Sequence, residues 1–420
     1  MLIYYFIVLL SAVPKHPWFG EQIGGVSMFK LLGAISVLYA LLQLTKRRTV
    51  PPFITTWPGR LFLLLFLWAL TSFVANSLGG TMGQSAMMIY TSFLSFFLVT
   101  VIVVDSQQRL RWAVLSLIGA IVWASAYTIR EWQLGGFGAA RPGWVAGDAN
   151  FFTAGALMVM PTMYFLAQAG QAKWERRFCL AALGISLVAV VAAASRGGLL
   201  GLSVAYTYVF LRSKQKLKLG LLVIPVLVFL LVAPSSPIKR IVAPNYGDKV
   251  SADSRLTLWS AGWKMIKRNP ILGVGLGNFK YESSKEVSGG KMAHNTYVEY
   301  AAELGVFGMM CFLGILISSW RILRRIEKRA AAIKDKFFVA VTTGFQAGIL
   351  AFCVTVFFAP GEYEKPLWVV VFLTACLPSV FDAYCATLPA HKEEHQPEPE
   401  PAAANPWATA WTTTRAWSIR

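Results

Sequence analysis

Long apolar runs repeat along almost the whole chain. A run of about 20 apolar residues can cross the roughly 30 Å hydrocarbon core of a bilayer as a helix. The pattern therefore predicts an all-α polytopic membrane protein with about twelve transmembrane helices in one domain, residues 1–390. The predicted helices lie near residues 2–13, 28–44, 60–77, 84–104, 111–129, 150–169, 178–194, 196–211, 217–233, 296–319, 337–359 and 366–386.

The seventh and eighth runs form one apolar stretch that is interrupted only at residues 195–198, Ser-Arg-Gly-Gly. A single helix of about 34 residues would be roughly 50 Å long, well beyond the thickness of a hydrocarbon core. Glycine tolerates the backbone angles of a tight turn. We therefore expect two helices that reverse direction at this break.

The composition agrees with a membrane protein. Hydrophobic residues make up 56% of the 420 residues and charged residues only 14%. A soluble domain carries roughly a quarter charged residues, so a soluble globular protein is excluded. The formal charge of +19 does not indicate nucleic-acid binding, because much of it lies in short connections between apolar runs, where it signals topology. The five cysteines lack the spacing of a metal site or a disulfide framework.

Positive charge falls on alternate connections, and cytoplasmic connections of membrane proteins are enriched in lysine and arginine. Twelve spans with both termini in the cytoplasm satisfy this rule. This topology places residues 130–150, the break at 195–198 and a long, large loop at 234–295 on the periplasmic side. It leaves residues 391–420, rich in proline and glutamate, as a disordered cytoplasmic tail. The basic connections contain residues 46–48, 109–111, 173–177, 212–218 and 321–336.

Three residues on the predicted periplasmic side could carry chemistry. Arg196, at the helix break, either reaches toward headgroup phosphates or lines a cavity and binds an anion. Arg255 belongs to an amphipathic stretch, residues 254–268, and either contacts lipid headgroups or points into a site. His294 directly precedes Asn295, a plausible helix N-cap where the long loop meets the tenth run. A lone histidine is more often structural, and this one matters because it shares a side with the two arginines.

Other features refine this picture. Arg141, in the 130–150 connection, could help to line the same site, as could Asn295. The glycine-rich run at 273–277 lacks the lysine and the strand–helix context of a phosphate loop, so it predicts close backbone packing. No paired aspartates lie on the predicted outer loops and no Cys/His cluster occurs, so no metal site is predicted. Two guanidinium groups can instead bind a diphosphate and stabilise the charge that develops on it.

The motifs resemble those of the O-antigen ligase family of bacterial inner-membrane proteins. They are Ser-Arg-Gly-Gly at 195–198, Arg-x-x-x-Trp at 255–259, Asn-Pro-Ile-Leu-Gly-Val-Gly-Leu-Gly-Asn-Phe at 269–279 and Ala-His-Asn-Thr-Tyr-Val-Glu-Tyr at 293–300. The resemblance implies a type C glycosyltransferase-like fold. It also implies a metal-independent, inverting glycosyltransferase that needs no cofactor and transfers a glycan from undecaprenyl diphosphate to an acceptor hydroxyl. By this resemblance, Arg196 and Arg255 would bind the diphosphate and His294 would activate the hydroxyl.

The resemblance leaves the acceptor open. Transfer of O-antigen to lipid A-core, in lipopolysaccharide biosynthesis, is favoured because the chain lacks an extra C-terminal domain. An O-antigen polymerase and a protein O-glycosylation ligase are the alternatives. A transporter of lipid-linked glycan is a more distant alternative, since many transporters have two matching halves and the long loop has no counterpart in the first half. The expected partners are the lipid-linked donor, the acceptor and membrane lipids, and no nucleic acid.

Overall fold

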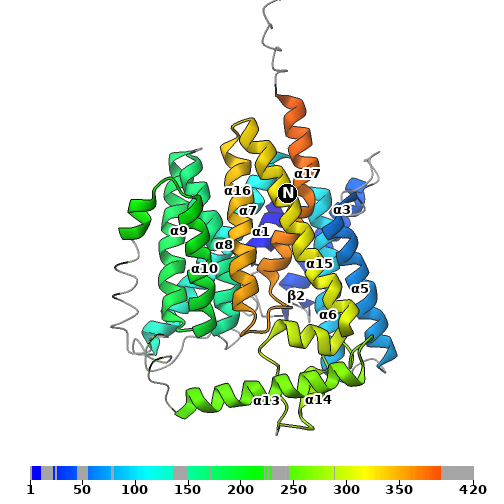
Figure 1. Cartoon of the computed structure of the whole chain (residues 1–420). Helices are drawn as coiled ribbons and strands as arrows, with labels where there is room; N and C mark the ends of the chain where they lie inside the picture. The colour runs from blue at the N-terminus through cyan, green and yellow to red at the C-terminus, as the bar shows by residue number, and fades with distance from the viewer. Residues whose placement is uncertain are drawn as a thin grey trace, which may run out of the picture.

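The computed structural model describes residues 2–10, 22–23, 26–44, 55–76, 80–135, 149–170, 172–221, 246–287 and 289–388, with residues 224, 228, 238 and 242. Nearly all of this part of the chain is helical (Figure 1). One short antiparallel pair also occurs in it, where β1 (Gln22–Ile23) lies beside β2 (Val26–Ser27). Arg141 and the predicted tail at 391–420 lie outside the described residues.

Helices occupy the positions of the apolar runs. Seven of the described helices are long and apolar enough to cross a membrane. This confirms an all-helical polytopic membrane protein, whereas the total of twelve spans and the side on which the long loop lies stay predictions. The run predicted at 217–233 is described continuously only over residues 216–221, which are helical. The seven helices are α5 (Trp57–Ala75), α6 (Gly80–Val103), α7 (Gln107–Leu134), α8 (Ala149–Ala169), α15 (Thr296–Ala332), α16 (Lys336–Thr355) and α17 (Lys365–Thr387). The other described helices are α1 (Leu2–Leu10), α3 (Met28–Leu44), α9 (Lys173–Ala192), α10 (Arg196–Arg212), α13 (Tyr246–Arg268) and α14 (Phe279–Ser283).

The chain reverses direction at the predicted break between α9 and α10. α10 then runs alongside α8, because Ser195 contacts Asn150 at the start of α8 and Ser213 contacts Tyr164 near its end. The expectation of two helices in place of one long helix is therefore confirmed, but the expected role of the glycines in the turn is wrong: Ala194 has the positive φ, 49°, whereas Gly197 and Gly198 lie inside α10. α8 is buried along nearly its whole length, between α9 and α10 on one side and α16 on the other.

An aromatic cluster joins α5, α6 and α17 in the core. Phe62 of α5 lies 5.2 Å from the ring of Phe97 on α6 and 4.9 Å from that of Phe372 on α17, measured between ring centres. Trp368 of α17 joins the same cluster, 5.2 Å from Phe62. Burial of such large side chains dominates the energy of a core, and edge-to-face ring contacts add to it. The three helices are thereby held in one rigid group.

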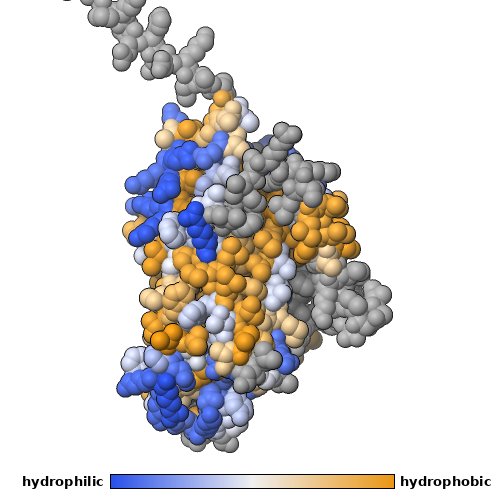
Figure 2. Space-filling view, turned by 90° about the vertical axis from the view of Figure 1, so that its right-hand side faces the viewer, coloured by the Kyte–Doolittle hydropathy of each residue, from blue (hydrophilic) through white to orange (hydrophobic). Residues whose placement is uncertain are grey.

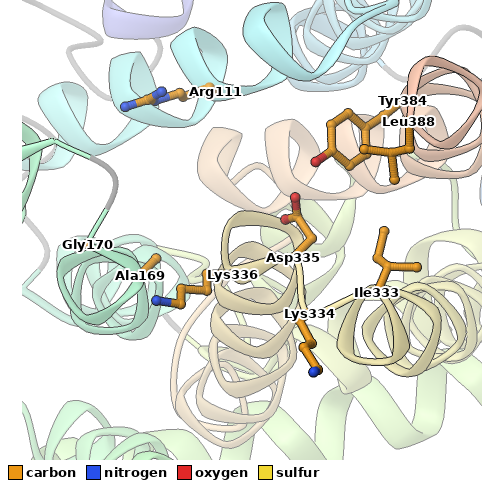
Figure 3. Close-up of a pocket in the computed structure, with 9 residues that line it drawn as sticks. All are labelled: Arg111, Ala169, Gly170, Ile333, Lys334, Asp335, Lys336, Tyr384 and Leu388. Carbon is orange, nitrogen blue, oxygen red and sulfur yellow. The ribbon is translucent and has the colours of Figure 1, made fainter. Parts of the chain in front are cut away.

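The basic connections that the structure describes, which exclude residues 46–48, meet at one end of the bundle. A cavity of about 440 Å³ lies there, bordered by Arg111 at the start of α7, Gly170 after α8, Lys336 at the start of α16 and Leu388 after α17 (Figure 3). The surface shows a hydrophobic band between two more hydrophilic ends (Figure 2). The alternation of charge along the sequence is thus an alternation between two ends of the molecule, which is the arrangement that the positive-inside rule requires.

One predicted connection is wrong. Residues 321–332, expected to be part of a charged connection, continue α15 as a regular helix. Leu323, Ile326 and Ala330 recur at helical spacing and are buried, which extends the packed face of α15 beyond the apolar run. Arg329 also forms an ion pair of 2.8 Å with Asp382 of α17. Only residues 333–335 connect α15 to α16.

The glycine-rich run packs into a kink of α15. Gly305 has φ 68° and ψ −177°, so the helix is interrupted there. Backbone N–H groups of Val274 and Gly275 donate to the carbonyls of Ala302 and Glu303, at 2.8 and 3.0 Å. A Cβ atom on Gly305 would collide with the carbonyl group of Ile271. The predicted role of the run in close backbone packing is therefore confirmed.

The segment from α13 to α14 covers the end of the bundle opposite the basic connections, with α13 lying across the bundle (Figure 1). The amphipathic stretch predicted at 254–268 is part of α13, which begins earlier, at Tyr246. Leu258, Ala261 and Met265 on α13 are buried against Phe279 of α14 and Ala293. The long loop is therefore an ordered layer in the described residues 246–287 and 289–295, and it leads directly into α15.

Candidate active site

His294 lies at the entrance to α15 in a strained conformation. Asn295 is the N-cap of the helix, and its side-chain oxygen accepts hydrogen bonds from the backbone N–H groups of Tyr297 and Val298, at 3.0 and 3.2 Å. His294, one residue earlier, has φ 49° and is half-buried. A positive φ is uncommon for a residue with a side chain, and such strain clusters at functional sites. The predicted N-cap is confirmed, and the oxygen of Asn295 is occupied by capping.

The connection between α16 and α17 is bound to the start of α15. Thr296 donates its backbone N–H to Val356 O, at 3.0 Å, and its hydroxyl to Ala359 O, at 2.9 Å. The same hydroxyl accepts from the N–H of Gly361, at 2.6 Å. The hydroxyl of Tyr297 donates to Cys353 O, at 2.8 Å. Residues 353–361 are therefore fixed directly beside the His294–Asn295 pair.

Arg196 is the first residue of α10. Ser195 caps this helix by accepting from the N–H of Gly198, at 2.9 Å, and donates its hydroxyl to Asn150 Oδ1, at 2.6 Å. A Cβ atom on Gly197 would lie 2.9 Å from Cβ of Phe358, so the half-buried Arg196 stands beside the connection between α16 and α17. A cation at a helix N-terminus is unfavourable by itself, since the free N–H groups there already attract negative charge. Helix end and guanidinium together favour a bound anion.

Arg255 approaches from the covering layer. It is half-buried on α13, one helical turn before Trp259, and residues at this spacing share a face. The indole N–H of Trp259 donates to the carbonyl of Ala293, the residue before His294, at 2.9 Å. The Trp259 ring also meets the ring of Phe357 edge to face, 5.5 Å between centres. The face of α13 that carries Arg255 is thus turned toward His294 and Phe357.

Phe357 and Phe358 contact the segments that carry the three predicted residues. Their rings lie 5.2 Å apart. Phe358 packs on the start of α10 beside Arg196, and Phe357 contacts Trp259 on the face of Arg255. Residues more than 90 positions apart in the sequence therefore converge at one end of the bundle. The structure groups Arg196, Arg255 and His294, and it says nothing of Arg141.

Buried carboxyl groups next to this site escaped the sequence analysis. Glu299 and Glu303 lie on α15, and Glu362 and Glu364 lie in the short connection before α17; each is at most 5% exposed. Glu303 accepts from the backbone N–H groups of Gly277 and Phe279, at 2.9 and 3.0 Å, and so holds the glycine-rich run in place. The signal was present in the sequence, because a carboxyl group inside an apolar run is costly and usually functional or paired.

Burial of Glu362 has an electrostatic consequence. The loss of hydration raises the pKa of the Glu362 carboxyl to about 8, and the neighbouring Glu303 raises it further than burial alone would. A carboxyl group with such a pKa holds its proton at neutral pH for a large part of the time. The site therefore combines two guanidinium groups and an imidazole with a buried, largely neutral Glu362 behind them. Among the described residues, no three His, Cys, Asp or Glu side chains are arranged to hold a metal ion.

One comparison with known proteins finds a family for part of the chain. Residues 181–313 match the family model described as O-antigen ligase. The matched range includes Arg196, Arg255 and His294, and it spans the end of α9, α10, the covering layer and the first half of α15. No curated protein matches the chain.

Proposed function

We propose that this chain, a member of the O-antigen ligase family by its residues 181–313, transfers a glycan from undecaprenyl diphosphate to the hydroxyl group of an acceptor. The favoured reaction is ligation of O-antigen to lipid A-core at the periplasmic face of the bacterial inner membrane, with both termini in the cytoplasm. One observation carries the proposal, namely the convergence of Arg196, Arg255 and His294 around Phe357 and Phe358 at one end of a membrane bundle.

The two arginines are assigned to the diphosphate of the donor. Arg196 adds its charge to the free N–H groups at the start of α10, and Arg255 approaches from α13 on the other side. Guanidinium groups bind phosphate oxygens through two parallel hydrogen bonds, which are shorter and stronger than neutral ones. When the glycosidic C–O bond breaks, its electron pair goes to the diphosphate oxygen, and the arginines stabilise that charge.

His294 is assigned to the acceptor. Its imidazole accepts the proton of the acceptor hydroxyl while the oxygen attacks the anomeric carbon from the side opposite the diphosphate. The new C–O bond forms as the old one breaks, so the configuration at the anomeric carbon is inverted. His294 precedes the first turn of α15 with φ 49°, so it does not occupy a regular helical position. The mechanism needs no metal ion, since the guanidinium groups supply the charge.

Two alternatives share these residues. An O-antigen polymerase and a protein O-glycosylation ligase would use the same donor chemistry with another acceptor hydroxyl. A transporter of lipid-linked glycan would need cations along a path between the two ends, whereas the arginines of the candidate site lie at one end.

The deciding experiment is complementation of a bacterial strain that lacks its own O-antigen ligase. Wild type is compared with Arg196→Ala, Arg255→Ala and His294→Ala at matched membrane expression. Arg176→Ala, an exposed arginine near the start of α9 at the far end, is the control. We expect long-chain lipopolysaccharide with wild type and control, and a loss of about 10²–10⁴-fold for His294→Ala, as for removal of a general base.

Two results would argue against the proposal. Full activity of His294→Ala would remove the assigned base. If the wild-type chain is present in the membrane and restores nothing, ligation to that acceptor is wrong, and the same variants are then assayed for polymerisation and for transfer to protein.

A further inference from the structure

α13 has a second face that no part of the described protein covers. Side chains on a helix advance by about 100° per residue. Leu258, Ala261 and Met265 form the face that packs on the protein. Leu256 and Trp263 lie roughly on the opposite side and are 62% and 58% exposed. Because the buried face packs on the bundle end that α13 covers (Figure 1), the exposed face lies on the side of α13 away from that end.

α14, beside α13, also has an exposed side. Its Phe279 is fully buried, whereas the neighbouring Tyr281 is 65% exposed. α13 and α14 lie side by side, linked by an ion pair of 2.9 Å between Lys264 and Glu286, just after α14. The exposed rings of Trp263 and Tyr281 each lie beside the ammonium group of the lysine four residues later. Lys267 Nζ lies 5.7 Å from the Trp263 ring centre, and Lys285 Nζ lies 5.9 Å from the Tyr281 ring centre.

The uncovered face is strongly positive. Residues 253–291 carry six exposed lysines and arginines against three carboxylates, those of Asp253, Glu282 and Glu286. Both glutamates are already paired, Glu282 with Lys285 and Glu286 with Lys264. Within the part of the chain that the structure describes, Lys267 and Lys280 are exposed and form no ion pair, and the exposed Arg268 lies close enough to Glu286 to lower the pKa of that carboxyl. We call Leu256, Trp263, Lys267, Arg268, Lys280 and Tyr281 the outer surface of α13–α14.

We propose that the outer surface of α13–α14 binds the acceptor, and that the acceptor is an anionic, phosphorylated oligosaccharide. This proposal rests on the proposed function. Flat aromatic rings pack against the C–H faces of sugars, and unpaired ammonium and guanidinium groups bind phosphates by charge-assisted hydrogen bonds. Uncompensated positive charge beside exposed rings is complementary to such a partner, and it would also speed its capture.

The outer surface is connected to the candidate site. The backbone of Lys291 is bound to α14, since Ser283 Oγ donates to Lys291 O at 2.8 Å, and His294 follows three residues later. On the inner side of α13, Trp259 bonds to Ala293. An oligosaccharide on the outer surface therefore lies one helix diameter, about 10 Å, from the residues assigned to the reaction. A chain of several sugars spans this distance.

Anionic lipid headgroups are the rival partner, because an amphipathic helix with Trp and Lys can also lie on a bilayer. The geometry favours the oligosaccharide. A helix that covers the bundle end with its buried face directs the opposite face away from the membrane core. Leu256 and Trp263 occupy that opposite face, so their exposure is explained by a partner outside the bilayer.

The test is direct binding to the full chain in nanodiscs of zwitterionic lipid. The probe is the soluble phosphorylated core oligosaccharide released from O-antigen-free lipopolysaccharide, and the same oligosaccharide after removal of its phosphates is the matched probe. The variants are Trp263→Ala and the double variant Lys267→Glu/Arg268→Glu. The control is Trp57→Ala, since Trp57 is 64% exposed with Arg60 5.5 Å from its ring centre, and it begins α5 at the other end of the bundle.

We expect the double variant to bind the phosphorylated probe at least about 10-fold more weakly, and Trp263→Ala several-fold more weakly, with Trp57→Ala unchanged. Wild type should bind the phosphate-free probe about 10-fold more weakly. Equal binding by wild type and the double variant, or no binding by wild type, would overturn the proposal. The proposal would also be overturned if the double variant lost binding to anionic-lipid vesicles but bound the phosphorylated probe like wild type, because that result would assign the surface to the bilayer.

The same samples separate this proposal from the proposed function. His294→Ala should bind the phosphorylated probe like wild type, because His294 is not part of the outer surface of α13–α14. If wild type binds the probe but transfers no glycan under any condition, the transfer reaction is wrong and the binding surface stands. If transfer occurs while the double variant keeps the wild-type KM for the acceptor, the surface is wrong and the transfer reaction stands.

Discussion

Replacing Glu362 by glutamine tests whether this buried carboxyl behind the candidate site is held in its protonated form. Glu362 lies between α16 and α17, is 3% exposed, and shares its surroundings with Glu299 and Glu303 of α15. Burial raises its pKa from 4.5 to about 8 in the folded protein. Glutamine has nearly the same shape as protonated glutamate and cannot ionise, so Glu362→Gln fixes the neutral state.

The sign of the pH effect follows from proton binding. Between the unfolded pKa of 4.5 and the folded pKa of about 8, the native protein holds a proton on Glu362 that the unfolded chain has released. The free energy of unfolding therefore falls as pH rises through this window, by about 1.4 kcal/mol per pH unit for one proton. From about pH 5.5 to pH 7.5, wild type should lose up to about 3 kcal/mol that Glu362→Gln keeps.

The measurement is the apparent Tm of both proteins in the same detergent at a fixed scan rate, because membrane proteins often unfold irreversibly. The Tm of wild type should fall relative to that of Glu362→Gln as pH rises, by an amount on the order of a few degrees. Glu286→Gln is the control, since Lys264 lowers the pKa of the exposed Glu286, which leaves it ionised throughout the window. If Glu362→Gln were the less stable protein at pH 7.5, Glu362 would be ionised and favourably bound, and the reasoning would fail.

Three further substitutions test the packing around the site. Gly305→Ala should lower the apparent Tm, because residues with a side chain rarely adopt the backbone angles of Gly305. This strain costs about 1–3 kcal/mol, and the collision of the new Cβ atom with Ile271 adds to it. Gly184→Ala is the control: it lies in open space on α9 and should leave the Tm unchanged. Ser195→Ala should lower the free energy of unfolding by about 1 kcal/mol, because α10 loses its N-cap. The variant should therefore have a lower apparent Tm but the same helix content as wild type. Trp259→Phe keeps the ring contact with Phe357 but loses the hydrogen bond to Ala293 O. Transfer activity should therefore fall clearly while the apparent Tm changes little. Wild-type activity in this variant would show that the hydrogen bond does not position His294.

Local signals in the sequence predicted much of the helical framework. An apolar run of spanning length must bury its backbone polar groups in a helix, whatever surrounds it. Ser195, placed before two glycines inside a stretch too long for one span, predicted the reversal between α9 and α10. Asn295, placed before an apolar run, predicted the start of α15, and its side chain caps the helix. Each of these features depends on residues within a few positions of one another.

The grouping of the site was beyond local signals. Arg196, Arg255 and His294 meet through Phe357 and Phe358, and nothing in the sequence near either phenylalanine indicates this contact. The motifs predicted which residues matter, because they resemble a known family, but gave no physical reason for their proximity. The charged end of α15 was missed for a similar reason: residues 321–332 are too polar to span a membrane, yet their apolar positions at helical spacing extend the packed face.

The position of the candidate site follows from how its parts are held. The connection between α16 and α17, residues 356–364, contacts the start of α15 through Thr296, the start of α10 through Phe358, and α13 through Phe357. A group that stabilises charge in a transition state is effective only when it is fixed beforehand, so this connection is what makes three distant residues act together. A change that loosens it should therefore reduce donor binding and acceptor activation at once, although none of its residues is assigned to the chemistry. Substitution of Arg196 or Arg255 should instead reduce donor binding more than acceptor activation, and substitution of His294 should do the reverse.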